Sequence, residues 1–334
     1  MAEGITLDSV LTPGAKEGRL AKQMLKVGVP KNNLEKAITL NEDQPENNTR
    51  VVRWGRYSSL PISTVVVDEG ITPIAVQLER EEVSASLDQH IGLIQTTDVL
   101  HYLHPDFKVN IATQRLGEQA ATTIETKRYN VYKAGTILRR ANGTARTDIN
   151  TVIDITDLRW AERAMARALA EYFTDLGQST QDFNTEAILP AYWGFIHPDA
   201  RYVISDITGF TGVKDYGHGV KIEPNELGSI GNIRFLMSTV YAPFASGGGA
   251  HGTTISTDGT SADVYTCIIV GREAWGSVSF RGRKSISPFV VMPSHSAADP
   301  AAQRGFIGWV AWTQAKILND NWMCRIEFAV TELS

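Results

Sequence analysis

The sequence lacks the features of a secreted, membrane-spanning or nucleic-acid-binding chain. Its 334 residues include two cysteines, Cys267 and Cys324, both inside apolar strand-like runs, so we expect buried free thiols and no disulfide. No apolar run approaches the ~18 residues needed to span a bilayer, and the first residues lack a signal-peptide layout. A formal net charge of −5 argues against a dedicated nucleic-acid binder. We therefore expect a protein made in the cytosol.

Common catalytic motifs are also missing. No Gly-x-Ser-x-Gly elbow, Walker-type loop or His-Glu-x-x-His helix occurs. His101 and His104 could share a metal with the nearby Asp106, but no Cys or third His completes the set, which favours two surface histidines. The run Gly228–Gly231 leads into a strand, so a tight turn is favoured over a phosphate loop. We expect neither enzymatic activity nor a cofactor or metal.

One long extended stretch has too little around it to be buried. Residues 51–67 are rich in β-branched and aromatic side chains, 68–73 have turn chemistry, and the run that follows alternates. The first arm could reach about 55 Å at roughly 3.3 Å per residue, whereas a globule of this length has a radius of gyration of about 20 Å. An isolated two-stranded ribbon is marginal in water, so we expect an arm lying on another subunit; two ordinary strands of one large sheet are the alternative. The apolar face of the returning run is predicted to hold Val83, Ala85, Leu87, Ile91 and Leu93.

The clearest helix is predicted from Asp106 to Lys133. Its apolar residues recur at three-, four- or seven-residue steps, which predicts one stripe, with Glu125 and Arg128 on the polar faces. About 28 residues at 1.5 Å per residue give roughly 42 Å, and a narrow stripe on so long a helix suits a strut lying across a sheet. The stripe comprises Val109, Ala112, Leu116, Ala120, Ile124 and Val131.

The second half of the chain is predicted to be mainly β. A helix over 157–175, capped by Thr156 or Asp157, precedes several strand-like runs. A loop at Gly247–Gly249 is expected to be a flexible surface tip. The last two runs, 306–317 and 322–330, are predicted to form a hairpin. Three tryptophans in these runs lack basic neighbours, so core or subunit packing is favoured over base stacking; they are Trp309, Trp312 and Trp322. The other predicted strands span 201–207, 233–240, 264–270 and 289–292.

Three blocks of sequence carry a resemblance to a known family. They are ELGSIGNIRFLMST (226–239) with YAPF (241–244), DVYTCIIVGREAWG (263–276), and ADPAAQRG (298–305) with WTQAKILNDNW (312–322). Through these blocks, and through Arg53–Tyr57 and Asp68–Gly70, the chain resembles the major capsid proteins of tailed bacteriophages. Within them it is most similar to the family typified by the Escherichia coli podovirus N-four. The likeness covers most of residues 50–334.

The resemblance implies an α+β chain with the Hong Kong 97-like fold in four parts. Residues 1–50 would be the N-arm, and residues 51–96 the extended β-hairpin loop that reaches onto the adjacent subunit. Residues 97–150 and 291–334 would form the peripheral domain with its long spine helix. Residues 151–290 would form the axial domain, which meets its copies around five- and six-fold axes.

The same resemblance implies a major capsid protein that self-assembles into the icosahedral shell around a phage double-stranded DNA genome. Its partners would be copies of itself in hexamers and pentamers, portal, scaffolding and decoration proteins, and packaged DNA through weak non-specific contact, with no membrane. It would assemble in the cytoplasm of the bacterial host and reside in the virion. Two other classes stay open: the shell of a bacterial nanocompartment with the same fold, and an α/β hydrolase or binding protein.

We expect the extended loop to contact neighbouring subunits. Charges near its turn, at Glu79–Glu82, are either plainly solvated or paired across subunits, where charge complementarity fixes register more than it adds affinity. The residues predicted to lie at this contact are Trp54, Tyr57, Val65, Val67, Glu69, Arg80 and Glu82.

Overall fold

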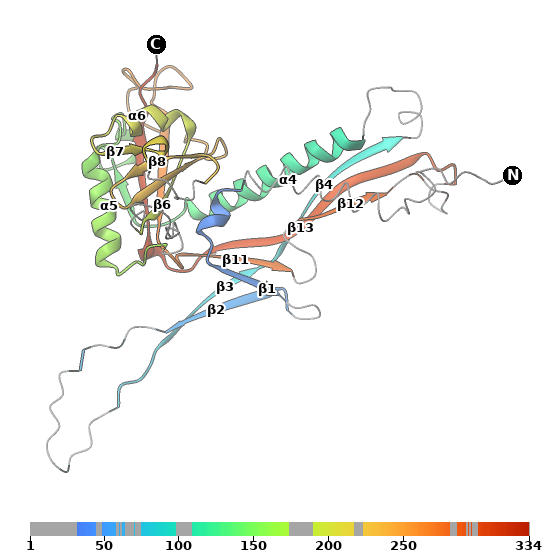
Figure 1. Cartoon of the computed structure of the whole chain (residues 1–334), viewed down its shortest axis with the longest axis horizontal. Helices are drawn as coiled ribbons and strands as arrows, with labels where there is room; N and C mark the ends of the chain where they lie inside the picture. The colour runs from blue at the N-terminus through green and yellow to red at the C-terminus, as the bar shows by residue number, and fades with distance from the viewer. Residues whose placement is uncertain are drawn as a thin grey trace, which may run out of the picture.

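The computed structural model describes residues 32–44, 49–57, 60, 62–63, 70, 75–97, 109–173, 190–216, 223–280, 286–291, 293, 295 and 300–333. Within these ranges the chain forms a five-stranded wing sheet, a seven-stranded body sheet and a two-stranded ribbon (Figure 1). The wing and the ribbon extend away from the body in different directions (Figure 1). No helix in these ranges has the length and apolar character required to cross a bilayer.

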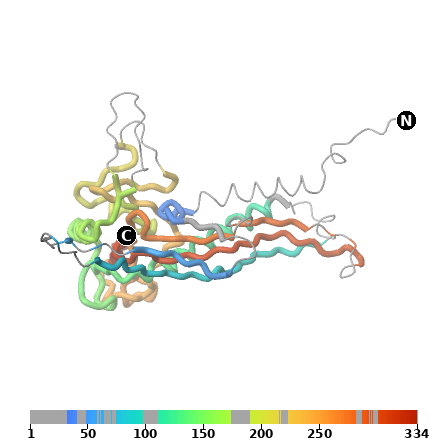
Figure 2. The backbone as a smooth tube through the Cα atoms, turned by 90° about the horizontal axis from the view of Figure 1, so that it is seen from below, coloured from blue at the N-terminus to red at the C-terminus, as the bar shows by residue number. Residues whose placement is uncertain are grey.

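The wing sheet is organised around β13, whose residues Arg304–Ile317 pair with strands on both edges. Strand β4 (Asp88–Thr97) runs antiparallel along one edge. Strands β12 (Ser287–Val291) and β11 (Trp275–Phe280) follow one another along the other edge. Strand β1 (Leu40–Gln44) then joins β11 in parallel. Figure 2 shows these strands running along the length of the wing.

Helix α4 (Val109–Tyr132) covers one face of the wing sheet, as expected of a strut. Its buried side chains pack on the sheet residues Ile307, Trp309 and Ala311. The predicted stripe is confirmed at four positions, which are Ala112, Leu116, Ala120 and Ile124.

The prediction that Glu125 and Arg128 lie on a polar face was wrong, because both side chains are buried. The last turns of α4 leave the wing and enter the body. There the Tyr132 ring stacks on Trp275 with centroids 3.9 Å apart, and the Tyr129 hydroxyl lies 2.7 Å from the Thr266 hydroxyl. The helix therefore has a wide buried surface at its end and a narrow one at its start.

The body sheet has the order β5-β14-β10-β6-β9-β8-β7. Helices α5 (Ile155–Arg167) and α6 (Arg201–Ser205) pack in the core cluster on one face. The end of α4, the short helix η2 (Leu34–Ala37) and Trp275 pack on the other. Its strands are β5 (Leu138–Arg140), β6 (Tyr192–Ile196), β7 (Phe210–Gly212), β8 (Glu226–Ile230), β9 (Ile233–Met237), β10 (Val264–Val270) and β14 (Met323–Ala329).

The helices of the body correct two predictions. Helix α5 begins after Asp154, which is its N-cap, and it ends at Arg167, because Leu169 adopts a φ of +55° and is 81% exposed. Residues 201–207, predicted as a strand, contain α6. Short apolar runs fit either period, and here Pro198 opens a helical turn that continues into α6.

The predicted C-terminal hairpin is also wrong. Strand β13 belongs to the wing sheet, whereas β14 pairs antiparallel with β10 and parallel with β5 in the body sheet. The turn helix η6 (Asp320–Trp322) carries the chain from one sheet to the other. Most of β14 is buried, so it requires cover on both faces, which the interior of the body sheet provides.

A tight turn and backbone hydrogen bonds define the conformation of two glycine-containing segments. Gly231, with a φ of +55°, forms the tight turn between β8 and β9, as predicted. The run Gly247–Gly249, expected to be a flexible tip, packs against its own chain: Gly248 N–H donates to the Ala262 carbonyl and Gly249 N–H to the Ile149 carbonyl, both at 2.9 Å. A Cβ at Gly248 would meet the Ile149 carbonyl oxygen at 2.3 Å.

Candidate assembly surfaces

The ribbon pairs β2 (Val51–Tyr57) with β3 (Arg80–Ser86) in antiparallel register, from Val51 opposite Ser86 to Tyr57 opposite Arg80. Beyond these strands, apolar side chains lie open to solvent, 56% to 91% exposed; they are Leu60, Ile62, Val76 and Leu78. Among the described residues, these large apolar groups on both arms of a thin ribbon are left exposed. Such a surface is typical of a contact with another molecule.

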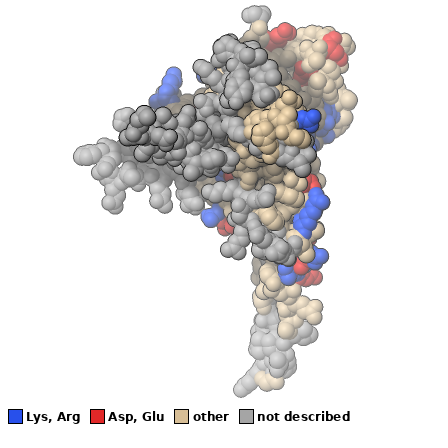
Figure 3. All heavy atoms as spheres, turned by 90° about the vertical axis from the view of Figure 1, so that its right-hand side faces the viewer, with Lys and Arg blue, Asp and Glu red and all other residues tan. Residues whose placement is uncertain are grey.

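Charged side chains pair across the ribbon within one chain. Arg56 lies 2.5 Å from Glu81, and Arg53 lies 3.7 Å from Glu82. Glu82 also lies 3.4 Å from Arg80 of its own strand. In the space-filling view, basic and acidic atoms are interspersed at the base of the downward projection that the ribbon forms (Figure 3). These side chains are exposed, so each pair stabilises the ribbon by about 0.2–1 kcal/mol at most. Their alternating signs favour one register of the two strands.

The root of the ribbon is part of the molecule's own core. Val52, Trp54 and Leu87 pack with Val278 of β11. Trp54 is 8% exposed, which leaves its indole little surface for another subunit. The ring anchors the ribbon to the wing sheet, and its contact with a neighbouring subunit stays a prediction.

The remaining predicted contact residues divide into two groups. Tyr57, Arg80 and Glu82 are exposed, so their surfaces are open to a neighbour, and their contact with one stays a prediction. The guanidinium of Arg80 lies across the ribbon at Gly55, where a Cβ would meet Nε at 2.5 Å. The other predicted contact residues lie outside the described ranges; they are Val65, Val67 and Glu69.

A second apolar surface, which we name the open face, is the side of the wing sheet opposite α4. Ile91 and Leu93 of β4 are 58% and 53% exposed, and they lie opposite Val310 and Gly308 of β13. Val291 at the end of β12 is also exposed. Within the described ranges these large apolar groups on a flat sheet are left to solvent, which is unusual for a finished surface.

The predicted apolar face of the returning run is covered along only part of its length: Ala85 and Leu87 are buried against Val278, whereas Ile91 and Leu93 are exposed. Val278 pairs with Gln314 of β13, which is on the same side of the sheet as Val310, the partner of Ile91. The ribbon root therefore covers one end of this side, and Ile91 and Leu93 lie beyond it. On the opposite side Gly92 faces α4, and a Cβ there would meet the Trp309 indole nitrogen at 2.2 Å. The helix therefore covers the even-numbered positions of β4 and leaves the odd-numbered ones exposed.

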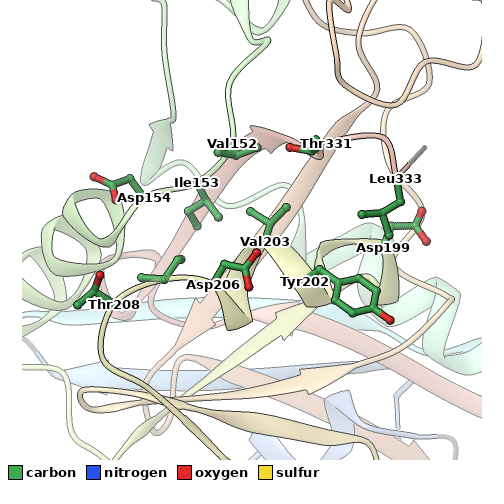
Figure 4. Close-up of a pocket in the computed structure, with 11 residues that line it drawn as sticks. Val152, Ile153, Asp154, Asp199, Tyr202, Val203, Asp206, Thr208, Thr331 and Leu333 are labelled. Carbon is green, nitrogen blue, oxygen red and sulfur yellow. The ribbon is translucent and has the colours of Figure 1, made fainter.

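A cavity of about 390 Å³ lies beside α6 (Figure 4). Asp154, Asp199 and Asp206 lie on its walls with apolar side chains between them. Two of these carboxylates have structural partners. Asp199 accepts a 2.7 Å bond from the Tyr265 hydroxyl, and backbone N–H groups at the start of α5 lower the pKa of Asp154. The cavity thus combines negative charge with apolar walls.

Other candidate groups have structural surroundings. Cys267 and Cys324 are buried free thiols, as predicted, and burial raises the pKa of Cys324 to about 12. Trp309 is buried against α4, as expected for core packing. His101 and His104 lie outside the described ranges. Within those ranges no group of three or more His, Cys, Asp or Glu side chains is placed to hold a metal.

The comparisons with known proteins find likeness in structure only, since no protein-family model and no curated protein matches the sequence. The capsid of Ralstonia phage GP4 superposes with a TM-score of 0.61 at 12% identity, over 91% of this chain and 93% of that chain. The capsid of cyanophage P-SCSP1u gives 0.57 at 12% identity, over 90% and 88%. The SrpI encapsulin of Synechococcus elongatus PCC 7942 gives 0.53 at 8% identity, over 100% and 94%.

At these identities the likeness establishes the fold. The chain has the α+β, Hong Kong 97-like fold of phage capsid proteins, as the sequence resemblance implied. The sequence analysis missed the open face. The alternating residues Ile91 and Leu93 indicated an apolar strand face, but alternation alone does not show which face of a strand a helix covers.

Proposed function

We propose that the chain is a major capsid protein that self-assembles into an icosahedral shell enclosing a phage double-stranded DNA genome. One observation carries the proposal: a single chain has both a projecting apolar ribbon and an uncovered apolar sheet face. The fold that it shares with phage capsids supports the same conclusion. Ile91, Leu93 and the apolar ribbon residues would be covered only when copies associate.

In this proposal the ribbon of one copy lies on the open face of the next. The two surfaces are different patches of the molecule, so the contact is heterologous, and heterologous contacts generate rings when the rotation closes. Complete burial of one Leu or Ile side chain contributes about 1.5–3 kcal/mol. Several modest contacts per copy give association that is reversible while the shell forms and that becomes strong once each copy has all its neighbours.

The finer assignments are part of the same proposal. Residues 1–50 serve as the N-arm and 51–96 as the loop onto the neighbour. Residues 97–150 and 291–334 form the peripheral domain, and residues 151–290 form the axial domain around five- and six-fold axes. The sheets do not follow these bounds throughout, since β5 and β14 belong to the body sheet and β11 to the wing sheet. Hexamers and pentamers then assemble in the host cytoplasm with portal, scaffolding and decoration proteins. The resemblance of the sequence to tailed-phage capsids supports this layout. No enzymatic step is part of the role.

A nanocompartment shell is the second candidate, because an encapsulin shares the fold over the whole chain. The two candidates differ in what the particles contain. Particles isolated from producing cells that hold double-stranded DNA support the capsid, and particles that hold a folded protein cargo support the compartment.

The proposal is tested by removing the apolar character of the open face. The double variant Ile91→Glu, Leu93→Glu should fold, because both side chains are exposed, and should fail to form particles. The matched control is Ile111→Glu, which changes an isoleucine 50% exposed on α4 and should still assemble. Light scattering and negative-stain microscopy measure assembly, and circular dichroism checks the fold. Normal particles from the double variant, or a wild-type chain that stays monomeric at high concentration, would refute the proposal.

A second variant tests the ribbon itself. Deletion of residues 65–77 should leave a folded core, because the buried root at Val52 and Trp54 remains, and should abolish shells. Intact particles from this deletion would show that the ribbon is dispensable for assembly.

A further inference from the structure

Three guanidinium groups surround one buried carboxylate at the junction of α4, β5 and β14, and a lysine lies beside them. Glu327 of β14 is completely buried. Its Oε1 lies 2.7 Å from Arg146 Nη2 and 3.3 Å from Arg325 Nε, and its Oε2 lies 3.7 Å from Arg140 Nε. Lys133, just beyond α4, completes the group, because its ammonium shares the Phe244 ring with Arg146 and interacts with the charges of Arg146 and Arg325. We name these four side chains the cation cluster.

The cluster holds more positive than negative charge. Lys133 has no carboxylate partner among the described residues. Its ammonium lies 5.4 Å from the centroid of the Phe244 ring, and the Arg146 guanidinium lies 3.7 Å from the same centroid. Besides Glu327, the carboxylate near the cluster is the exposed Asp148, which interacts with Arg140 and accepts bonds from backbone N–H groups. Two carboxylates thus face four cations.

Like charges held together out of water disfavour their own charged forms. Burial and the neighbouring Arg146 and Arg325 lower the pKa of Lys133. Burial also lowers the pKa of Arg325, although Glu327 opposes that change. The Oε2 atom of Glu327 has no hydrogen-bond donor, and neither does the buried Nε of Arg140 find an acceptor. Three arginines share the single carboxylate of Glu327, and Lys133 has no carboxylate of its own among the described residues. Because buried charges in proteins are normally paired, this excess of positive charge favours the binding of a further anion.

We propose that the cation cluster binds an oxyanion with the chemistry of a phosphate group. The side chains of Arg140 and Arg146 are 29% and 35% exposed, so an anion can reach them from solvent. Guanidinium groups match the several oxygens of a phosphate and bind it through paired N–H donors. Lys133 adds a point charge at the same place.

The phosphate has two possible sources with the same chemistry: free inorganic phosphate, or the phosphodiester backbone of nucleic acid. The site itself does not depend on the proposed shell function; only the nucleic-acid source rests on it. One site per chain on a protein of net charge −5 would give a weak, salt-dependent contact. Such a contact would bind nucleic acid weakly and reversibly.

Equilibrium dialysis of the full-length protein with radiolabelled inorganic phosphate tests the site. We expect about one phosphate bound per chain, about tenfold weaker binding in Lys133→Gln, and unchanged binding in the control Lys316→Gln, which removes an exposed lysine of β13. Circular dichroism verifies that each variant is folded. Wild-type protein that binds no more phosphate than Lys133→Gln overturns the proposal, as does an equal loss in Lys316→Gln.

A charge reversal provides an independent readout. Lys133→Glu supplies an internal anion, so it should abolish phosphate binding and raise the midpoint of thermal unfolding measured without phosphate. A lowered midpoint would mean that the cluster already has balanced charge, and the proposal would fail. Competition by a double-stranded DNA oligonucleotide identifies the source: displacement of labelled phosphate shows that the site accepts phosphodiesters, and lack of displacement restricts it to free phosphate.

Discussion

A buried carboxylate connects the N-terminal segment of the described chain to the long helix, and its removal should release that segment. Glu125 of α4 is fully buried. Its Oε1 accepts bonds from Asn33 N–H at 3.1 Å, Leu34 N–H at 3.0 Å and the Tyr241 hydroxyl at 2.8 Å. The two N–H groups belong to the start of η2. Asn33 is held further through its side-chain amide, which donates to the Met237 carbonyl at 2.8 Å.

The variant Glu125→Ala leaves these three donors without their acceptor. An unsatisfied buried donor costs about 1–3 kcal/mol, and partial entry of water relieves some of that cost. We therefore expect a loss of about 3–5 kcal/mol in the free energy of unfolding, with the largest effect at residues 34–37. Glu125→Gln keeps an acceptor oxygen of the same reach, so it should cost less than Glu125→Ala.

The pH dependence has a defined sign. Burial raises the pKa of Glu125 above its ordinary value of 4.5, although its hydrogen bonds and Arg128 oppose the change. A raised pKa means that the folded state holds the proton more tightly. The contribution of Glu125 to stability is therefore fully present below pH 4.5 and is lost as the pH rises through the raised pKa. Glu125→Gln cannot titrate, so it should lack this loss.

Hydrogen exchange of the amides of Leu34–Ala37 and urea unfolding at pH 5 and pH 8 measure both effects. Faster exchange at these amides in Glu125→Ala, with unchanged exchange in the centre of β10, is the expected pattern. The reasoning would be refuted if Glu125→Ala kept wild-type exchange at residues 34–37. It would also be refuted if Glu125→Gln lost stability with rising pH as the wild type does.

Two further changes test the wing and the ribbon. Leu116→Asp places a charge between α4 and the wing sheet, at a side chain that is 2% exposed. Because a buried unpaired charge is costly, we expect insoluble or unfolded protein. A soluble, assembling variant would show that the stripe is misplaced. Arg80→Glu removes an exposed ion pair with Glu82 worth about 0.2–1 kcal/mol, so the monomer should keep its circular dichroism spectrum. If Arg80 pairs with a neighbouring subunit, electron microscopy should show impaired particles. Normal particles would contradict that pairing.

The local sequence pattern was sufficient to predict an element whose own apolar residues repeat at a regular spacing. The apolar stripe at Ala112, Leu116, Ala120 and Ile124 predicted the strut helix, because a helix with one apolar face has one way to cover a sheet. The turn at Gly231 and the buried thiols of the body sheet were likewise predicted from the sequence, since each depends on its immediate neighbours.

Tertiary structure decided the questions that depend on partners far along the chain. Alternation in residues 323–329 predicted a strand, but only the packed molecule pairs it with β10 rather than β13. Ala85 and Leu87 are covered because they pack with Val278, whereas Ile91 and Leu93 on the same side stay exposed. Which part of that side is covered depends on distant partners that no short window of sequence contains. The burial of Glu125 and the gathering of Arg140 and Arg146 around Glu327 have the same origin, because electrostatic surroundings are set by distance in space. Residues nearly two hundred positions apart can lie within 3 Å of one another.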